Sequence, residues 1–316
     1  ETAANDLNIM IETPVESLDP QIGQDGTSFE VIADFTDGLM QMDAEGAPIP
    51  AIAESYELSE DGLTYTFHLR DDAKWSNGVE VTAADFVFGW QRAVDPKNAC
   101  EYSYMMSDIG QVKNAAEIIA GEKDKSELGV TALDDTTLQV ELNVPVSYFL
   151  SLMYFPTFYP VNEEFYNTCA DTFASSPETT LANGAFVLDS YEPAATTIHL
   201  SKNPYYYDAD KIALSGLHYQ VIQDSQQALM SYQTGALDMT IVNGEQVDQV
   251  EDDPEFLSIG AGYLWYIAPN IRNVPELANL NIRLALTMAI DREAITNDVL
   301  KDGSKPTYTA VPPQFA

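Results

Sequence analysis

Histidine is the first side chain to consider for chemistry in this sequence, because only three occur, at His68, His199 and His218. Each lies in a run of alternating apolar and polar residues, a pattern that predicts a strand. None has the His-x-x-x-His spacing that brings two ring nitrogens to one metal ion on a helix. The pattern therefore favours a structural role for all three over a catalytic or metal-binding one.

Adjacent carboxylates are the second candidate for chemistry. They occur at Glu60-Asp61, Asp71-Asp72 and Asp134-Asp135, and two opposed carboxylates can do the acid–base work of a glycosidase. All three pairs stand in turn-like sequence, where aspartate caps the backbone. Since the chain has 50 acidic residues, such neighbours also arise by chance. A carboxylate-based hydrolase stays open as the enzyme alternative, whereas the main expectation is a protein that is not an enzyme.

Motifs for nucleophilic and nucleotide chemistry are absent from the sequence. There is no Gly-x-Ser-x-Gly elbow, no Gly-x-x-x-x-Gly-Lys phosphate loop and no dinucleotide fingerprint. We therefore expect no cofactor and no bound metal.

The charge balance restricts the partners that the chain can have. Lys and Arg number 14 against 50 Asp and Glu, which gives a formal net charge of −36. Such a surface repels phosphates and anionic lipid headgroups, so we expect neither nucleic-acid binding nor electrostatic docking on a membrane. The acidic excess is interpreted as a solvated exterior, and 45% hydrophobic residues provide ample material for folded cores.

Cysteines and apolar runs give little further information. The two cysteines, Cys100 and Cys169, form neither a disulfide framework nor a Cys-x-x-Cys metal pair, and whether they pair with each other stays open. No apolar run approaches the roughly 18 residues that span a bilayer, and the first ten residues lack a signal-peptide pattern. Membrane association is expected only through a removed or absent N-terminal anchor.

The most ordered pattern is a strand, a turn, a second short strand and a helix in succession. Apolar and polar residues alternate over 63–69, Asn77-Gly78 supplies a turn, and the alternation resumes over 79–81. Thr82 followed by Asp85 has the spacing of a helix cap. These elements predict a scaffold and not a reactive site.

Helix and strand patterns mix along the remaining chain, which predicts a mixed α/β fold. Strands are expected over 7–11, in a hairpin around Asp134-Asp135, as a pair within 183–207, and over 237–242. Helices are expected with apolar faces at Phe29, Ile32, Ala33 and Thr36, at Ala228, Leu229 and Tyr232, and at Ile282, Ala285, Leu286, Ala289 and Ile290. The loop 16–28 is expected at the surface, and the aromatic segment 148–161 either packs in a core or lines a ligand groove.

Six motifs, taken in chain order, resemble those of the family 5 extracellular solute-binding proteins of bacterial ABC importers, most closely the oligopeptide-binding branch. They are SLDPQ at 17–21, the long segment from FTDGL to AVDP at 35–96, NGAF at 183–186, NPYYY at 203–207, YQTGALDM at 232–239 and NIRLALTMAIDRE at 281–293. The resemblance covers nearly the whole chain, and the long central segment is its most specific part.

The resemblance implies a periplasmic-binding-protein type II-like architecture of two lobes with an extra inserted subdomain. It places lobe I at 1–40 and 181–262, the inserted subdomain at 41–180 and the start of lobe II at 263–316. Members of the family continue considerably further, so we expect a truncated second lobe in this chain. Half of such a clamp is expected to hold its ligand weakly.

The resemblance also implies a function. Family members capture short peptides and deliver them to the permease subunits of an ABC transporter, either as lipoproteins on the extracellular face of the membrane or in the periplasm. Backbone pairing with an extended peptide gives affinity that tolerates varied side chains. Nickel, haem or glycoside ligands stay open, because scaffold motifs do not encode the cargo.

Ligand-binding residues are implied at three places. The loop Gln24, Asp25, Gly26 and Thr27 resembles the ligand loop of lobe I, and Tyr102 resembles a tyrosine that packs against bound peptide. The segment YLWYIAPN resembles the crossover strand into lobe II, which makes Tyr263, Trp265, Tyr266, Ala268 and Asn270 candidates. Packing between the lobes is the alternative role for Trp265 and Tyr266. Peptide binders of the family can carry an acidic residue near the position of Ala268, and its absence weakens the case for binding basic side chains there.

Overall fold

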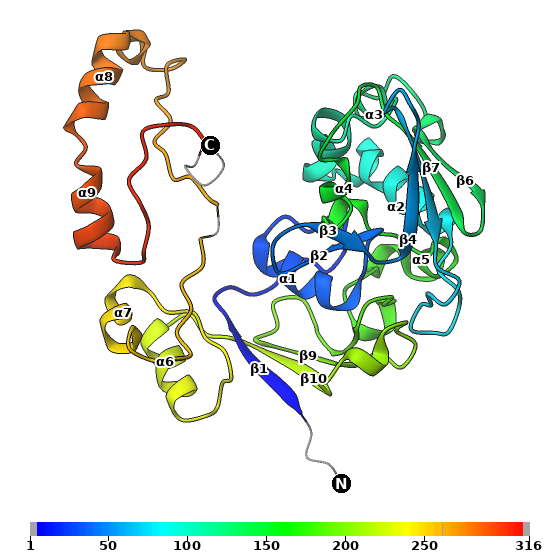
Figure 1. Ribbon diagram of the computed structural model, residues 1–316, viewed down its shortest axis with the longest axis horizontal. Helices are drawn as coiled ribbons and strands as arrows, with labels where there is room; N and C mark the ends of the chain where they lie inside the picture. The colour runs from blue at the N-terminus through cyan, green and yellow to red at the C-terminus, as the bar shows by residue number, and fades with distance from the viewer. Residues whose placement is uncertain (1–4, 261, 312–316) are drawn as a thin grey trace. The chain divides into compact units, whose positions relative to one another are not determined.

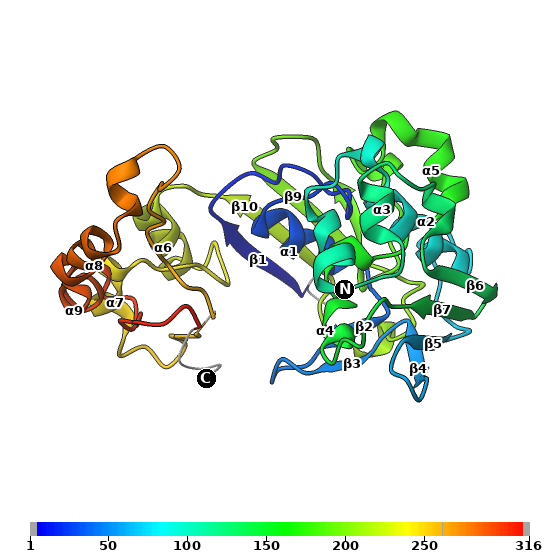
Figure 2. The same ribbon diagram turned by 90° about the horizontal axis from the view of Figure 1, so that it is seen from above.

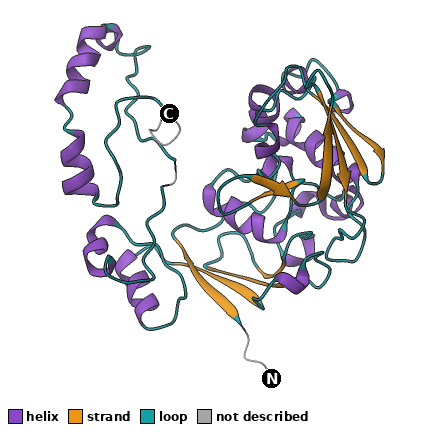
Figure 3. Cartoon of the chain, viewed as in Figure 1, coloured by secondary structure: helices purple, strands orange, loops and turns teal. Residues whose placement is uncertain are grey.

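The computed structural model describes residues 5–260 and 262–311 and has a mixed α/β architecture (Figure 1). Two compact units are present. The first runs up to Gln223 and also contains Ser231–Thr240, and the second contains Asp224–Met230 and the residues from Ile241 onward. Helices and strands alternate in the first unit, whereas the second is built from helices and loops (Figure 3). The predicted mixed α/β class is confirmed.

One four-stranded sheet of the first unit joins the beginning of the chain to segments about 200 residues later. Its order is β1 (Asp6–Ile11), β10 (Gly216–Val221), β9 (Thr197–Lys202) and β8 (Phe186–Ser190), with β1 parallel to β10 and the other neighbours antiparallel. Helix α1 (Gly26–Phe35) packs its apolar side on this sheet (Figure 2). Four strands and one helix therefore share a hydrophobic core.

A second four-stranded sheet of the same unit has the order β4 (Ala53–Leu58), β5 (Thr64–Leu69), β7 (Thr137–Glu141) and β6 (Val130–Asp134), and all its pairs are antiparallel. Helix α2 (Ala83–Val94) covers it, with Phe86 and Trp90 fully buried in the shared core. The predicted strand over 63–69 and the helix capped by Thr82 and Asp85 are both confirmed.

Shorter elements complete the first unit. They are β2 (Met40–Met42), β3 (Pro48–Pro50), α3 (Ala115–Ile119), α4 (Phe149–Leu152), α5 (Glu163–Cys169), a π-helix at Met105–Ile109 and 3-10 turns at Pro96–Asn98, Glu101–Ser103, Lys125–Glu127, Pro156–Phe158, Ala170–Thr172, Pro177–Thr179 and Ala209–Lys211. The aromatic segment 148–161 belongs mainly to the core, since Phe149, Phe158 and Tyr159 are buried.

The second unit contains α7 (Gly244–Val250), a 3-10 turn at Pro275–Ala278, α8 (Leu280–Ala289), α9 (Arg292–Ala294) and a π-helix at Ile295–Leu300, and α6 (Ser225–Gln233) begins in it. A capping box at Asn243 starts α7, and the side-chain amide of Gln246 donates to the Ser225 carbonyl at 2.8 Å. The predicted helix over 281–290 is present as α8, but its apolar stripe is exposed, with Leu286 at 50%.

Three local predictions are wrong. The segment 79–81 forms a single bridge, between Lys74 and Glu80, although Val81 is buried, and Val79 is exposed. The segment 237–242 likewise forms a single bridge, between Met239 and Ile9. Ala33 of α1 is exposed, since the helix starts at Gly26 and its buried positions are Ser28, Val31, Ile32 and Phe35.

Hydrophobic packing in the first unit forms two clusters. One extends from Leu39 to Phe158 around the β4-β5-β7-β6 sheet, and the other surrounds the β1-β10-β9-β8 sheet. The predicted residue limits of lobe I, the inserted subdomain and lobe II stay a prediction.

Candidate functional site

The loop Gln24–Thr27 is shaped by the start of α1. Asp25 has extended backbone and its carboxylate accepts a hydrogen bond from the Ser28 N–H at 2.8 Å, which is the arrangement of a helix N-cap. The Thr27 hydroxyl lies 3.1 Å from the Thr13 hydroxyl. A side chain built on Gly26 would meet no atom within 4 Å. The loop therefore exposes backbone groups beside open space, and its outer residue Gln24 is exposed.

Tyr102 lies next to this loop. The predicted ligand residues of the first unit are therefore close together. Its hydroxyl donates to the Gln24 carbonyl at 3.4 Å. The centroid of its ring lies 5.3 Å from that of Phe29, which it meets edge-on, 5.3 Å from that of Phe155 and 5.8 Å from that of Tyr104. We call Phe29, Tyr102, Tyr104 and Phe155 the aromatic group. It provides an apolar wall beside exposed peptide groups, a combination suited to an extended ligand with varied side chains.

Three members of the aromatic group were not predicted. Phe29 belongs to α1, and Phe155 to the segment whose predicted roles were core or groove. The sequence carries a signal for Phe155, because the density of aromatic residues over 148–161 predicts a groove as one of two roles. No signal in the sequence links Tyr104 or Phe29 to the site.

A buried ion pair fixes the base of the loop. Arg92 of α2 binds the Asp19 carboxylate through two nitrogens, at 2.6 and 3.1 Å, and also donates to the side-chain oxygen of Gln21. Burial alone would lower the pKa of Arg92, but the Asp19 carboxylate raises it above its ordinary value. The expectation that the whole loop 16–28 lies at the surface is therefore wrong for Asp19 and Gln21, which are buried.

The second set of predicted site residues belongs to the second unit. Tyr263, Trp265 and Tyr266 have exposed fractions of 81%, 89% and 78%, and Ala268 and Asn270 are exposed as well. The predicted crossover strand is absent from the described residues 262–270, which pair with no other strand. Without a paired neighbour the segment has no ladder of backbone hydrogen bonds to hold it extended.

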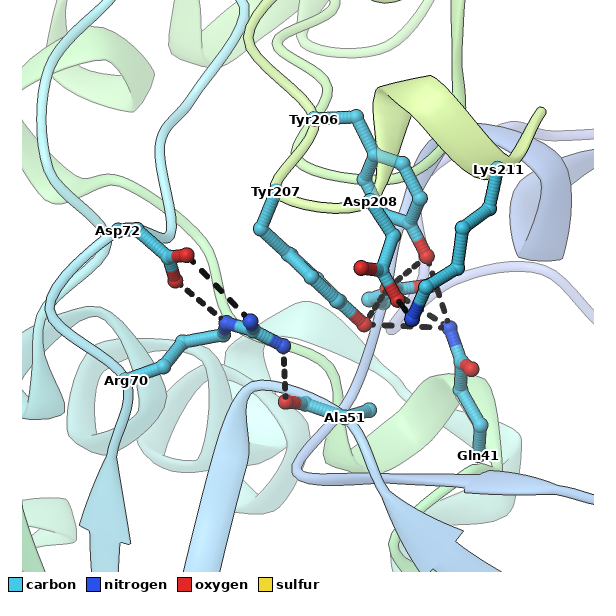
Figure 4. Close-up of polar contacts among 9 residues, drawn as sticks. Gln41, Ala51, Arg70, Asp72, Tyr206, Tyr207, Asp208 and Lys211 are labelled. Carbon is cyan, nitrogen blue, oxygen red and sulfur yellow. Dashed lines mark hydrogen bonds and ion pairs between the residues drawn. The ribbon is translucent and has the colours of Figure 1, made fainter.

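A buried carboxylate that the sequence did not single out lies in the first unit. Asp37 accepts hydrogen bonds from the side chains of Gln41, Tyr206 and Tyr207 at 2.9, 3.1 and 2.9 Å. Burial raises the pKa of Asp37, although these donors and the charge of Arg70 act in the opposite direction. In Figure 4 the Arg70 guanidinium approaches Tyr207 from one side and binds Asp72 and the Ala51 carbonyl.

The Asp37 cluster joins three of the sequence motifs. Asn183 exchanges two hydrogen bonds with the backbone of Asp37, at 3.0 and 3.1 Å. A Cβ on Gly184 would lie 2.7 Å from the backbone of Phe35, so this close approach requires glycine. FTDGL, NGAF and NPYYY therefore meet in a structural centre, where every polar group named here has its partner inside the protein.

The carboxylate pairs serve as turn residues. Asp61 accepts from the Ser59 hydroxyl and the Leu63 N–H, Asp134 accepts from the Thr136 N–H, and Asp72 pairs with Arg70. Hydrogen bonds lower the pKa of all three carboxyls, chiefly those from the Ser59 side chain to Asp61, from the Arg70 side chain to Asp72 and from the Thr137 side chain to Asp134. A general acid needs the opposite shift, so Asp61, Asp72 and Asp134 are unsuited to that role.

Metal clusters and membrane-spanning helices are both absent from the described residues. Over residues 5–260 and 262–311, no group of three or more His, Cys, Asp or Glu side chains is arranged to hold a metal ion. Within the same ranges, none of the helices has the length and apolar character needed to cross a membrane.

Comparison with known proteins identifies relatives along the whole chain. Residues 47–316 match the family model described as bacterial extracellular solute-binding proteins, family 5 middle. The dipeptide-binding protein DppE of Bacillus subtilis is 34% identical over 98% of this chain, and the periplasmic oligopeptide-binding protein OppA of Salmonella typhimurium is 35% identical over 95%. A probable deoxycholate-binding periplasmic protein of Escherichia coli, YgiS, is 37% identical over 94%. The chain spans only 55–56% of the length of these relatives.

Solved structures agree with the sequence comparison. Listeria monocytogenes OppA bound to peptide matches with a TM-score of 0.84 and 36% identity over 98% of this chain and 61% of that one. The pheromone receptor PrgZ, described with its mode of peptide binding, matches with a TM-score of 0.90 and 32% identity over the same shares. The type II-like fold predicted from the motifs is thereby confirmed.

Proposed function

The chain belongs to family 5 of the bacterial extracellular solute-binding proteins, and from this premise we propose that the whole protein captures short peptides for import by an ABC transporter. The observation that carries the proposal is the aromatic group beside the exposed backbone of Gln24–Thr27. Backbone groups recognise any peptide, and an aromatic wall accepts side chains of different shape. The same proposal assigns no catalysis to the protein.

Within this proposal, Gln24, Asp25, Gly26, Thr27 and Tyr102 contact the peptide. Residues Tyr263, Trp265, Tyr266, Ala268 and Asn270 of the second unit are proposed to contribute further contacts. Their exposure supports this role, because large aromatic side chains without a core contact in one unit are typical of binding surfaces. Loss of the Tyr102 ring should remove about 1–3 kcal/mol of binding free energy if the ring is buried against ligand.

The partners and location follow from the same premise. We propose that the protein works outside the cytoplasm and delivers its ligand to the permease subunits of the importer. Relatives described as periplasmic binding proteins support this location. The large negative charge supports a peptide ligand over nucleic acid or an anionic membrane surface.

Native mass spectrometry of the full-length protein incubated with a peptide mixture tests the proposal. Intact peptides should be retained at one per protein, and Tyr102→Ala should reduce their occupancy. Tyr56→Ala is the matched control, since Tyr56 is 43% exposed on the edge strand β4, among Tyr65 and Phe67.

Other outcomes have distinct meanings. Time-dependent cleavage of the peptides would replace the binding protein with a hydrolase. Retention of deoxycholate in preference to every peptide would assign the chain the ligand class named for the Escherichia coli relative. Equal occupancy in Tyr102→Ala, Tyr56→Ala and wild type would remove the aromatic group from the site.

A further inference from the structure

Two of the three histidines lie side by side on neighbouring strands. His199 of β9 is paired directly with His218 of β10 in the antiparallel register. The pairs 202–215 and 196–221, three positions away on either side, are hydrogen-bonded, since the Lys202 N–H donates to the Ser215 carbonyl and the Val221 N–H to the Thr196 carbonyl. Hydrogen-bonded and non-hydrogen-bonded pairs alternate along an antiparallel ladder. His199 and His218 therefore form a non-hydrogen-bonded pair, in which the backbones approach most closely, with Cα atoms about 4.5 Å apart.

The two imidazole rings use this close approach. Their centroids are 4.4 Å apart and the ring planes cross at 75°. Both side chains are partly exposed, so solvent and ions reach them. The sheet backbone holds both Cβ atoms, while the torsion that turns each imidazole about its Cβ–Cγ bond has a broad energy profile. The His199 ring can therefore turn a nitrogen toward His218 without movement of the strands.

A carboxylate holds one of the rings. Asp6 of β1, the strand on the other side of β10, places its Oδ2 3.2 Å from the Nε2 of His218. With a proton on Nε2, this contact leaves Nδ1 as the nitrogen with a free lone pair. Histidines that bind metals usually donate their second N–H to a carboxylate in this way, which fixes the tautomer and strengthens the ligand.

We propose that His199 and His218 chelate one divalent transition-metal ion of the Ni²⁺, Cu²⁺ or Zn²⁺ class. Imidazole is a preferred ligand for these ions, and Asp6 is the positioning residue that orients His218. Water completes the coordination sphere, because the described residues include no group of three or more His, Cys, Asp or Glu side chains arranged around an ion. The site is a surface chelate of two protein ligands, and its affinity is accordingly modest.

The third histidine provides an internal control. His68 lies on β5 in the other sheet of the same unit, 3.8 Å from Glu57 and 44% exposed. It resembles His218 in having a carboxylate neighbour. It differs in having no histidine across from it, because His199 and His218 both belong to the β1-β10-β9-β8 sheet. The acidic surface attracts cations without selectivity, and such binding does not depend on any histidine.

Titration of the full chain with Ni²⁺ by isothermal calorimetry tests the proposal. Wild-type protein should bind one equivalent, and His199→Asn and His218→Asn should each weaken binding at least tenfold. His68→Asn should leave the affinity unchanged, whereas Asp6→Asn should weaken it by about tenfold, as loss of a carboxylate behind a metal-bound histidine typically does. Thermal melting of each variant verifies that it is folded.

Several results would overturn the chelate. The first is the absence of saturable Ni²⁺ binding at neutral pH. The second is an equal loss of affinity in His68→Asn and His199→Asn. The third is a loss of affinity in only one of His199→Asn and His218→Asn. Where a variant does not fold, the histidine ring signals of wild-type protein are measured by NMR with substoichiometric Cu²⁺, which broadens the signals of nearby groups. The ring signals of His199 and His218 should broaden together and before that of His68, and any other order of broadening contradicts the proposal.

Discussion

Arg92 and Asp19 form a two-point ion pair between positions 73 residues apart, with N–O distances of 2.6 and 3.1 Å. The side chains are only 5% and 10% exposed. Arg92 also lies over the ring of Tyr166, at 4.5 Å. Because the pair joins α2 to the loop that precedes Gln24–Thr27, the position of the proposed ligand loop depends on a contact outside the ligand site.

Replacement of Arg92 by Met should lower the free energy of unfolding by about 3–5 kcal/mol, because the Asp19 carboxylate would stay buried without its partner. Urea denaturation measures the effect. The double variant Arg92→Met/Asp19→Asn should recover part of it, since no buried charge is then left unpaired. Lys211→Met is the surface control, as its pair with Asp208 is 76% and 34% exposed and should contribute less than about 1 kcal/mol. A loss below that level in Arg92→Met would contradict a stabilising role.

Tyr207→Phe should cost about 1.5–3 kcal/mol, because it removes a hydrogen bond to the buried Asp37 carboxylate. The neighbouring variant Tyr205→Phe serves as the control, since Tyr205 is 45% exposed and the side-chain donors to Asp37 are Gln41, Tyr206 and Tyr207. Thermal and urea unfolding of both variants make the comparison. Equal stability of the two would mean that the Asp37 cluster tolerates the loss of a donor.

Local patterns in the sequence predicted much of the fold, because they report interactions between near neighbours. The alternation over 63–69 became β5, and the capping box at Thr82 and Asp85 became the start of α2. The segment 237–242 also alternates, but Ile241 is 53% exposed, and one bridge is all that forms. Periodicity shows which side of a strand is apolar and does not show whether another strand is there to pair with it.

The candidate site was harder to predict, because its parts come from distant segments. Tyr102 meets Phe29 and Phe155, which precede and follow it by more than 50 residues. Asp19 appeared to belong to a polar surface loop, and only its partner Arg92 explains its burial. The resemblance to a family predicts Gln24–Thr27 and Tyr102 as ligand-binding residues. Composition and spacing alone predict neither.

Asp34 should make the free energy of unfolding fall as the pH rises from about 4 to 8. Burial raises its pKa to about 7, the hydrogen bond from Tyr219 lowers it and the charge of Glu30 raises it. The folded protein therefore holds this proton more tightly than the unfolded chain, whose aspartates titrate near 3.8. The resulting stabilisation is fully present below the unfolded pKa and is lost as pH rises through the folded pKa, by at most about 1.4 kcal/mol per pH unit.

The variant Asp34→Asn isolates this effect. Its stability relative to wild type should increase from pH 5 to pH 8, since the amide never ionises and its oxygen can still accept from Tyr219. Urea unfolding at four pH values gives the difference. Asp61→Asn is the control without pH dependence in this range, because hydrogen bonds from Ser59 and Leu63 lower the pKa of Asp61, and the carboxylate is then ionised in both the folded and the unfolded state from pH 5 to pH 8. A wild-type-minus-variant difference that does not change with pH would show that Asp34 titrates normally.

Asp25 separates the structural role of the proposed ligand loop from its binding role. Both carboxylate oxygens are occupied by Ser28, one by its N–H and the other by its hydroxyl. Asp25→Ala should therefore cost about 1 kcal/mol of stability through loss of the helix cap. Asp25→Asn should retain most of it, since asparagine is an equally good cap. Peptide affinity of the full-length protein, measured by calorimetry, should follow the same order, because Asp25 is proposed to contact the peptide through its backbone while its carboxylate holds the loop. A large loss of affinity in Asp25→Asn with unchanged stability would instead place the charge in direct contact with the peptide.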